Sequence, residues 1–241
     1  MRAATLAVLV LMGCTATGLA QDASATGEPA SAPTTTFFLA RTAQRLDASF
    51  AGTFHYLEFF QVRNRWIYPD IGYVDFAHSN YREFFVGGGR TLIENKWAAW
   101  DLELLYDQAT GPAAGSAAYL QPFTILRLFF TPKISGEAEY FAYLPLNDSA
   151  KFHNVLERTK IEYAVKKRWK IGAGYAGVNR LGTAWQNKPF ITTTISTEAG
   201  AFELWLQRIP NGAQAELRYR LVHKSLRRNA SDPAPSQGKA D

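Results

Sequence analysis

Apolar and polar side chains alternate along most of this chain, in stretches of roughly ten residues separated by short breaks. The clearest stretch is 97–107, where Leu102 and Leu104 alternate with Asp101 and Glu103. An alternation with a period of two predicts a β-strand, because successive side chains of an extended chain point to opposite faces. The pattern therefore predicts an all-β protein.

The alternation predicts about ten strands. They are 54–63, 81–93, 97–107, 119–131, 134–144, 154–166, 169–178, 189–197, 200–209 and 213–223. Long connections (64–80, 108–118, 145–153 and 179–188) take turns with tight ones (94–96, 131–133, 166–168 and 198–199), and only 210–212 breaks this order. Transmembrane β-barrels have short turns at one end, longer loops at the other and an even number of strands. We therefore predict an antiparallel up-and-down transmembrane β-barrel of about ten strands, with 8 to 12 as the range because a hairpin hidden within 64–80 would raise the count.

Aromatic residues gather near the ends of these strands. Trp97 and Trp169 follow tight turns, Phe129 precedes one, and Tyr106 and Tyr119 flank a long connection. Amphipathic rings favour the boundary between lipid and water, so this placement predicts two aromatic girdles.

The cost of placing charge in lipid decides which face of each strand points inward. A basic side chain that faces lipid near the membrane midplane costs about 2–4 kcal/mol. Inside a narrow barrel, acidic and basic groups can pair instead. We therefore predict a polar network in the barrel interior, and its six basic and seven acidic groups suit ion pairing better than an ion-selective lumen. The network comprises Asp101, Glu103, Arg127, Glu137, Glu139, Arg158, Lys160, Glu162, Lys170, Glu203, Glu216, Arg218 and Arg220.

The segments outside the barrel have distinct compositions. Residues 1–20 have the positive start, apolar middle and small-residue end of a secretory signal peptide. Residues 21–52 are expected to be a periplasmic linker, within which 37–48 forms either a short amphipathic helix or a lead into the barrel of residues 53–223. Residues 224–241 are expected to be a disordered polar tail. Cys14, the only cysteine, either leaves with the signal peptide or is lipidated, because the residues before it resemble a lipoprotein signal.

Charge and composition exclude several classes of function. The 241 residues carry a formal net charge of +5, much of it near the two ends, and this gives nucleic-acid binding little support. Gly87-Gly88-Gly89 lacks the Lys and Ser or Thr of a phosphate-binding loop, so these glycines are expected to mark a bend or close packing in a strand. Four scattered histidines and no mature cysteine give no metal site. We expect no cofactor.

Over residues 53–223 the chain resembles small bacterial outer-membrane β-barrel proteins of roughly ten strands. The features that carry this resemblance are the signal peptide, the alternation, and a final strand with Ala215, Leu217, Tyr219 and Leu221 on one face. The resemblance implies a Gram-negative outer-membrane location, periplasmic termini, and contact with lipid, lipopolysaccharide and the barrel-assembly machinery. Such proteins usually end on an aromatic residue, whereas this strand ends at His223 and a polar tail follows.

Some outer-membrane barrels are enzymes, so histidines near the strand ends are candidate catalytic residues. Outer-membrane phospholipases and lipid A deacylases carry His-x-Ser on a strand near the outer leaflet, whereas the only such spacing here, His223-x-Ser225, lies at the predicted periplasmic end. His78 and His153 lie at the predicted outer rim, and the ten-stranded omptin proteases use acidic residues and a histidine there. The spacing of the residues does not force a catalytic group to form.

The sequence thus favours a non-enzymatic, porin-like outer-membrane barrel, either a structural or surface-interaction protein or a narrow channel for small solutes. Two alternatives remain. One is a barrel enzyme that acts on lipid or peptide at the outer rim. The other is a soluble periplasmic calyx that binds a hydrophobic ligand, which would require the aliphatic faces to point inward.

Overall fold

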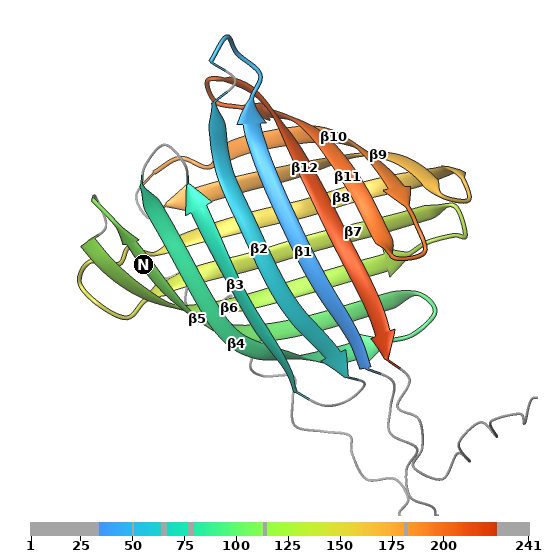
Figure 1. Cartoon of the computed structure of the whole chain (residues 1–241), viewed down its shortest axis with the longest axis horizontal. Coiled ribbons are helices and arrows are strands. Elements are labelled where there is room, and N and C mark those ends of the chain that lie inside the picture. The colour runs from blue at the N-terminus through green and yellow to red at the C-terminus, as the bar shows by residue number, and fades with distance from the viewer. Residues whose placement is uncertain are drawn as a thin grey trace, which may run out of the picture. The chain divides into compact units, whose positions relative to one another are not determined.

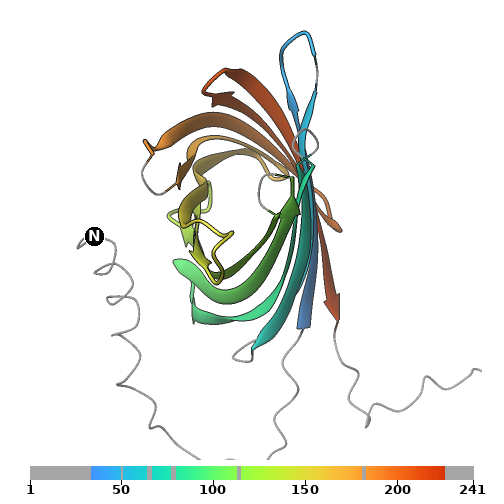
Figure 2. The same cartoon turned by 90° about the vertical axis from the view of Figure 1, so that its left-hand side faces the viewer.

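A computed structural model describes residues 34–49, 51–63, 67–76, 80–112, 115–180 and 183–225. They form antiparallel strands that close into a barrel (Figure 1). The strands are β1 (Thr34–Arg45), β2 (Gly52–Arg63), β3 (Tyr68–Phe76), β4 (Tyr81–Glu94), β5 (Ala98–Gly111), β6 (Gly115–Phe129), β7 (Ile134–Pro145), β8 (His153–Lys166), β9 (Trp169–Arg180), β10 (Gln186–Ser196), β11 (Gly200–Ile209) and β12 (Gly212–Ser225). Each strand pairs with its neighbours in sequence, and β1 pairs with β12 to close the ring (Figure 2).

The predicted class is confirmed, and the barrel has twelve strands rather than about ten. All ten predicted strands are present. The two others are β3, within the predicted long connection 64–80, and β1, within the predicted linker. In β3 the residues Pro69 and Gly72 resemble turn residues, and in β1 the consecutive apolar residues Phe37, Phe38 and Leu39 hide the alternation.

The strand β1 also corrects two expectations for the N-terminal part of the chain. A helix at 37–48 is wrong, and the barrel begins at Thr34 rather than at residue 53, so a linker spanning 21–52 is too long. The predictions for the signal peptide, Cys14 and the tail after residue 225 lie outside the described residues. No helix that is long and apolar enough to cross a membrane occurs in the described part of the chain.

The two ends of the barrel carry different connections. Both the start of β1 and the end of β12 lie at one end, together with the turns after β2, β4, β6, β8 and β10. We call this the terminal end and the opposite one the loop end. At the terminal end, side chains stabilise the tight turns: Asn95 Oδ1 accepts hydrogen bonds from the amides of Trp97 and Ala98, at 2.8 and 3.0 Å, and Thr131 Oγ1 accepts one from Ile134 at 2.9 Å.

The connections at the loop end are shorter than the sequence indicated. Because β5 and β6 extend further than predicted, the connection expected at 108–118 shrinks to 112–114. The longest connection among the described residues of this end is 146–152, between β7 and β8. It folds back on β6, since Asn147 donates to the carbonyl of Ser116 at 2.8 Å and accepts from the amide of Ala118 at 3.2 Å.

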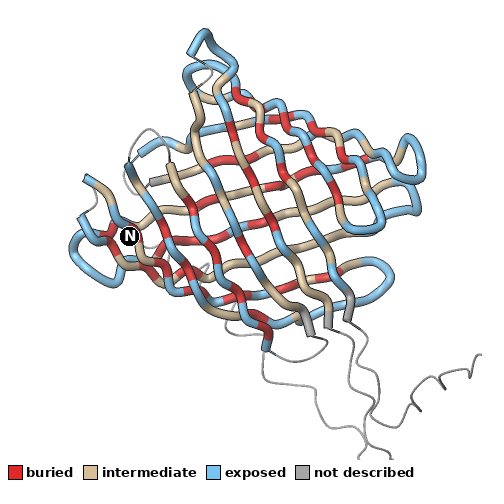
Figure 3. The backbone as a smooth tube through the Cα atoms, in the orientation of Figure 1, coloured by how far each residue is buried: buried red, intermediate tan, exposed pale blue. Residues whose placement is uncertain are grey.

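Burial alternates along the strands (Figure 3). Charged side chains are among the buried positions, and aliphatic side chains are exposed on the outside. On β5, Asp101 and Glu103 are 3% exposed, whereas Leu102 and Leu104 are 37% and 54% exposed. Trp97 and Trp169 are exposed near turns of the terminal end, as a girdle requires. Tyr119, also predicted for a girdle, instead faces the interior and is 5% exposed. The outer surface of the barrel is therefore apolar over the middle of the strands.

Candidate functional site: the barrel interior

The barrel encloses a cavity of about 940 Å³. Ser149 and Lys151 line it at the loop end, and Phe37 and Arg220, near the terminal ends of β1 and β12, line it further in. The cavity therefore follows the barrel interior from the loop end toward the terminal end, and its walls are the inward faces of the strands.

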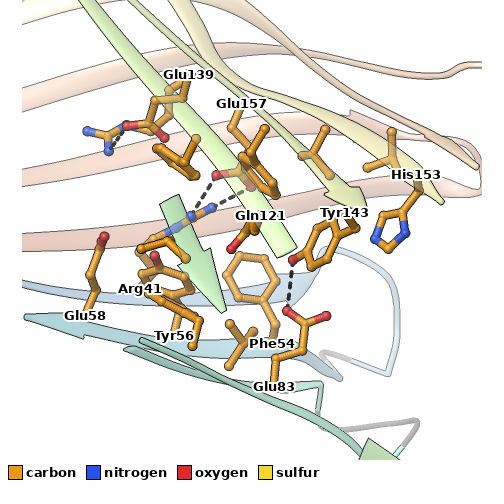
Figure 4. Close-up of a pocket in the computed structure, with 18 of the residues that line it drawn as sticks. Arg41, Phe54, Tyr56, Glu58, Glu83, Gln121, Glu139, Tyr143, His153 and Glu157 are labelled. Carbon is orange, nitrogen blue, oxygen red and sulfur yellow. Dashed lines mark hydrogen bonds and ion pairs between the residues drawn. The ribbon is translucent and has the colours of Figure 1, made fainter. Parts of the chain in front are cut away.

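An ion pair crosses this interior. Arg41 on β1 donates two hydrogen bonds to the carboxylate of Glu157 on β8, at 2.8 and 3.2 Å (Figure 4). These two strands are five positions apart around a ring of twelve, so they lie on nearly opposite walls. Arg41 also bonds Glu216 on β12 at 2.9 Å, and Glu216 bonds Arg218 at 2.6 Å. We refer to the pair of Arg41 and Glu157 as the strut.

A β-bulge in β8 makes the strut possible. The register between β8 and β9 shifts between Leu156 and Thr159, and Arg158 has a positive φ of 49°. A bulge places one extra residue in the strand, so both Glu157 and Arg158 point inward instead of to opposite faces. Arg158 then pairs with Glu137 at 2.7 Å and with Glu139 at 2.5 Å, both on the neighbouring strand β7.

Lys160 is the centre of a second group of charges. Its ammonium pairs with Glu203 of β11 and, at 3.4 Å, with Glu162 of its own strand. The indole of Trp205 and the hydroxyl of Thr192 also donate to Glu203. The whole group is buried, so the ion pairs and hydrogen bonds together offset the cost of removing these charges from water.

Small residues on β9 make room for large side chains of the next strands. Phe190 of β10 stacks on Trp205 with 3.8 Å between ring centroids, and the guanidinium of Arg218 lies 3.8 Å from the centroid of the indole ring. A Cβ atom on Gly174 would lie 2.4 Å from the ring of Phe190. Glycine at this position therefore permits the ring stack.

The structure places each of the thirteen predicted network residues at a defined position. Nine are buried: Asp101, Glu103, Glu139, Arg158, Lys160, Glu162, Glu203, Glu216 and Arg218. Four are half-buried: Arg127, Glu137, Lys170 and Arg220. Beyond the pairs above, Arg127 pairs with Asp101, Tyr68 donates to Glu103 at 2.7 Å, and Lys170 donates to Ser135 at 3.1 Å. Arg220 lines the cavity.

Seven further charged residues of the strands face inward and were missed by the sequence prediction. They are Arg41, Glu58, Asp70, Glu83, Asp107, Glu157 and Lys188. Five of the seven are acidic, so the predicted near-balance of six basic to seven acidic groups is wrong, and carboxylates are in excess. The adjacent charges Glu157 and Arg158 in mid-strand were the one sequence signal that could have revealed part of this set, because a regular strand cannot turn both inward.

Several of these carboxylates lie together on β2 to β5. Asp70 on β3 is 1% exposed and is close to Glu58 and Glu103. Among the described residues, none of the three forms an ion pair with a basic side chain. The glycines of β3 and β4 let these acidic side chains pack against the backbone. A Cβ atom on Gly89, for example, would lie 2.3 Å from the side chain of Glu103. The expectation that the glycines of β4 mark close packing is confirmed.

Aromatic rings line the loop end of the interior. Tyr143 stacks on His153 with 4.0 Å between ring centroids, and Tyr119 meets Tyr143 edge-on at 5.2 Å. The hydroxyl of Tyr143 donates to Glu83 at 3.0 Å. His153 Nδ1 lies 3.0 Å from the carbonyl oxygen of Lys151. These contacts hold His153 as part of an aromatic wall.

The other histidines named as candidate catalytic residues contribute less to a site. His78 lies outside the described residues, and His223 is exposed at the terminal end of β12. Within the described ranges, no three His, Cys, Asp or Glu side chains are arranged to hold a metal ion.

Comparison with known proteins places the chain beside bacterial porins of solved structure. No protein-family model matches the chain, and no curated protein matches its sequence. The KdgM porin, solved in complex with disordered oligogalacturonate, is 12% identical with a TM-score of 0.47; the match covers 78% of this chain and 98% of that one. The NanC porin is 8% identical with a TM-score of 0.48, over 78% and 100% of the two chains. Omp33 of Acinetobacter baumannii is 11% identical with a TM-score of 0.43, over 80% and 99%.

Proposed function

We propose that this protein is a non-enzymatic outer-membrane channel for small polar solutes. The faces of the barrel support the membrane location. Leu102 and Leu104 point outward while Asp101 and Glu103 point inward, which suits lipid outside and a polar lumen. A calyx for a hydrophobic ligand would need the opposite arrangement. With the terminal end in the periplasm, the loop end faces the cell exterior.

The observation that carries the proposal is the cavity of about 940 Å³ that follows the interior from the loop end toward the terminal end. A barrel that served only as a structural support could fill its interior with side chains. Here the polar groups inside leave a connected space and pair with one another across it, as the strut does. The strut also narrows the space, so we expect a low conductance.

Planar-bilayer recording of the folded barrel tests this function. The wild type is expected to give small discrete current steps. The double variant Arg41→Ala/Glu157→Ala removes both charges of the strut, so neither is left unpaired. Because the strut no longer narrows the lumen, the current steps should be several-fold larger. The matched control is Arg168→Ala/Glu198→Ala, which removes an exposed pair of 3.0 Å from the turn regions at the terminal end and should leave the conductance unchanged.

Each result distinguishes a channel from a closed barrel. Steps that grow when the strut is removed support a channel whose narrowest point is the strut. Steps seen only in the strut variant mean that the strut closes the native lumen. If neither protein conducts although both give a heat-modifiable folded band, the channel proposal is wrong and a structural or surface-interaction role takes its place.

A further inference from the structure

The part of the cavity between the strut and the loop end has a composition of its own, and we call it the outer chamber. Its side chains are Tyr81, Glu83, Tyr119, Phe123, Phe141, Tyr143 and His153. They come from β4, β6, β7 and β8. Figure 4 shows Tyr143, Glu83 and His153 at one side of the cavity and the strut at another. The strut thus forms the floor of the chamber.

The rings of the outer chamber form a continuous series. Phe123 stacks on Phe141 with 4.9 Å between centroids, Phe141 meets Tyr143 at 5.6 Å, and Tyr143 stacks on His153 at 4.0 Å. These residues lie two positions apart on their strands or are cross-strand partners. The series therefore lines one wall of the chamber from the loop end inward.

Two alanines allow Tyr143 to reach an acidic group three strands away. Tyr143 lies on β7 and Glu83 on β4, and the strands between them present Ala109 and Ala117, which are cross-strand partners and fully buried. Their small side chains let the tyrosine ring lie over β5 and β6. The sequence thus builds a chamber in which an aromatic wall ends on a carboxylate.

The negative charge of the outer chamber lacks a basic partner. Glu83 lines the cavity and is 5% exposed, whereas Asp107, beside it on the inward face of β5, is 0% exposed and does not itself line the cavity. Because Glu83 pairs with Ala109 and Phe85 pairs with Asp107, the two carboxylates are diagonal neighbours on the inward face. No ion pair to either is found among the described residues, and both oxygens of Asp107 lack a hydrogen-bond partner. Two buried carboxylates without a counter-charge are costly, and a bound cation would offset that cost.

Three basic side chains also line the cavity near the outer chamber, and no ion pair joins them to Glu83 or Asp107 within the described part of the chain. Arg41, at the floor, is held by Glu157 and Glu216. Lys151, also a lining residue, is exposed at the loop end, and Lys188 lines the cavity from the loop end of β10. The carboxylates of β4 and β5 therefore set the charge of the aromatic wall.

We infer that the outer chamber binds a small organic cation, an ammonium or guanidinium group on a flat apolar body, and that this is the class of solute that the channel admits. Aromatic faces attract cations, and a carboxylate among them adds a charged hydrogen-bond acceptor. Only the statement that the channel admits this class of solute rests on the proposed channel function. Binding itself requires just the chamber.

The test is equilibrium binding to the full-length barrel in detergent, followed by calorimetry. Three probes of similar size separate the possible ligands: phenethylammonium, 3-phenylpropanoate and glucose. Phenethylammonium should bind, and 3-phenylpropanoate should bind about a hundredfold more weakly because it faces like charge. Glu83→Gln keeps an acceptor for Tyr143 but removes the charge, so it should weaken binding of the cation by about tenfold.

Two more variants guard against misfolding as an explanation. Glu94→Gln, at the terminal end of β4, is the matched control and should leave binding unchanged. Ala117→Leu keeps every charge but fills the space beneath Tyr143, so it should also abolish binding while the barrel still gives a heat-modifiable band. Preference for glucose or for 3-phenylpropanoate by the wild type overturns the inference, whatever the variants do.

The two proposals fail in different ways. Binding of phenethylammonium to a barrel that does not conduct overturns the channel function alone. Conduction without binding of the cation overturns the inference about the outer chamber alone. A conducting barrel whose current phenethylammonium blocks from the loop end supports both.

Discussion

Arg158 has a backbone conformation that residues other than glycine seldom adopt, with φ at 49°. Such a conformation costs on the order of 1–2 kcal/mol, so something must stabilise it. The stabilising contacts are two ion pairs to β7, with Glu137 at 2.7 Å and Glu139 at 2.5 Å. The strained residue is also the one that turns its neighbour Glu157 inward to form the strut. A single backbone irregularity thus organises the charges of the lumen.

At this scale we predict that Arg158→Met destabilises the barrel by about 3–5 kcal/mol, since it leaves the buried carboxylate of Glu139 without its partner and leaves the half-buried Glu137 with only Lys160, at 4.0 Å. Denaturant unfolding of the purified barrel in detergent, followed by tryptophan fluorescence, measures the change. Arg168→Met is the control, because Arg168 and its partner Glu198 are largely exposed and such pairs contribute about 0–1 kcal/mol. Equal losses in the two variants would contradict the role assigned to Arg158.

Among the strands, β5 has the most regular alternation of burial and so gives the clearest test of which face meets lipid. Its outward side chain Leu104 is 54% exposed, and its inward neighbours Glu103 and Leu105 are buried. Thr110 also points outward but lies near the loop end of the strand. The two positions therefore differ in expected membrane depth while sharing a strand and a face.

We predict that Leu104→Arg costs about 2–4 kcal/mol of stability in a lipid bilayer, because a basic side chain near the midplane is poorly tolerated. Thr110→Arg should cost about 0–1 kcal/mol, since it lies close to the interface. Urea-dependent folding into lipid vesicles measures both. If Leu104→Arg folds as well as Thr110→Arg, then this face does not contact lipid.

How far each strand could be predicted depends on how regular its alternation is. In β5 every second residue is buried, so both the strand and its inward face were predictable. The strands β1 and β3 were missed because inward apolar residues such as Leu39 and breakers such as Pro69 hide the period. The adjacent charges Glu157 and Arg158 were a sign of the bulge in β8, but the pairing of Glu157 with Arg41 was out of reach, since Arg41 lies 116 residues away in the sequence. The outer chamber was missed for a similar reason: Tyr119 was assigned to a girdle, and only the three-dimensional pairing brings Tyr143 to Glu83.

In the whole molecule, every connection belongs to one of two ends. The turn between β4 and β5 lies at the terminal end, and the connection between β7 and β8 lies at the loop end. With the periplasmic orientation that we propose, a membrane-impermeant thiol reagent applied to intact cells should label Ser149→Cys but not Lys96→Cys. Both should react after permeabilisation. Labelling of Lys96→Cys alone in intact cells would show that the barrel has the opposite orientation.

The pairing of β1 with β12 has a consequence for how the molecule is made. Thr34 pairs with Ser225, so the seam joins the residues that lie farthest apart among the described strands. Until the last strand has been synthesised, β1 and β11 each present an unpaired edge, which is a site for aggregation. A chain that stops before β12 cannot close this ring, so closure must wait for the last strand. The same seam places Thr34 and Ser225 side by side at the terminal end, so a label attached at either residue would lie away from the loop end.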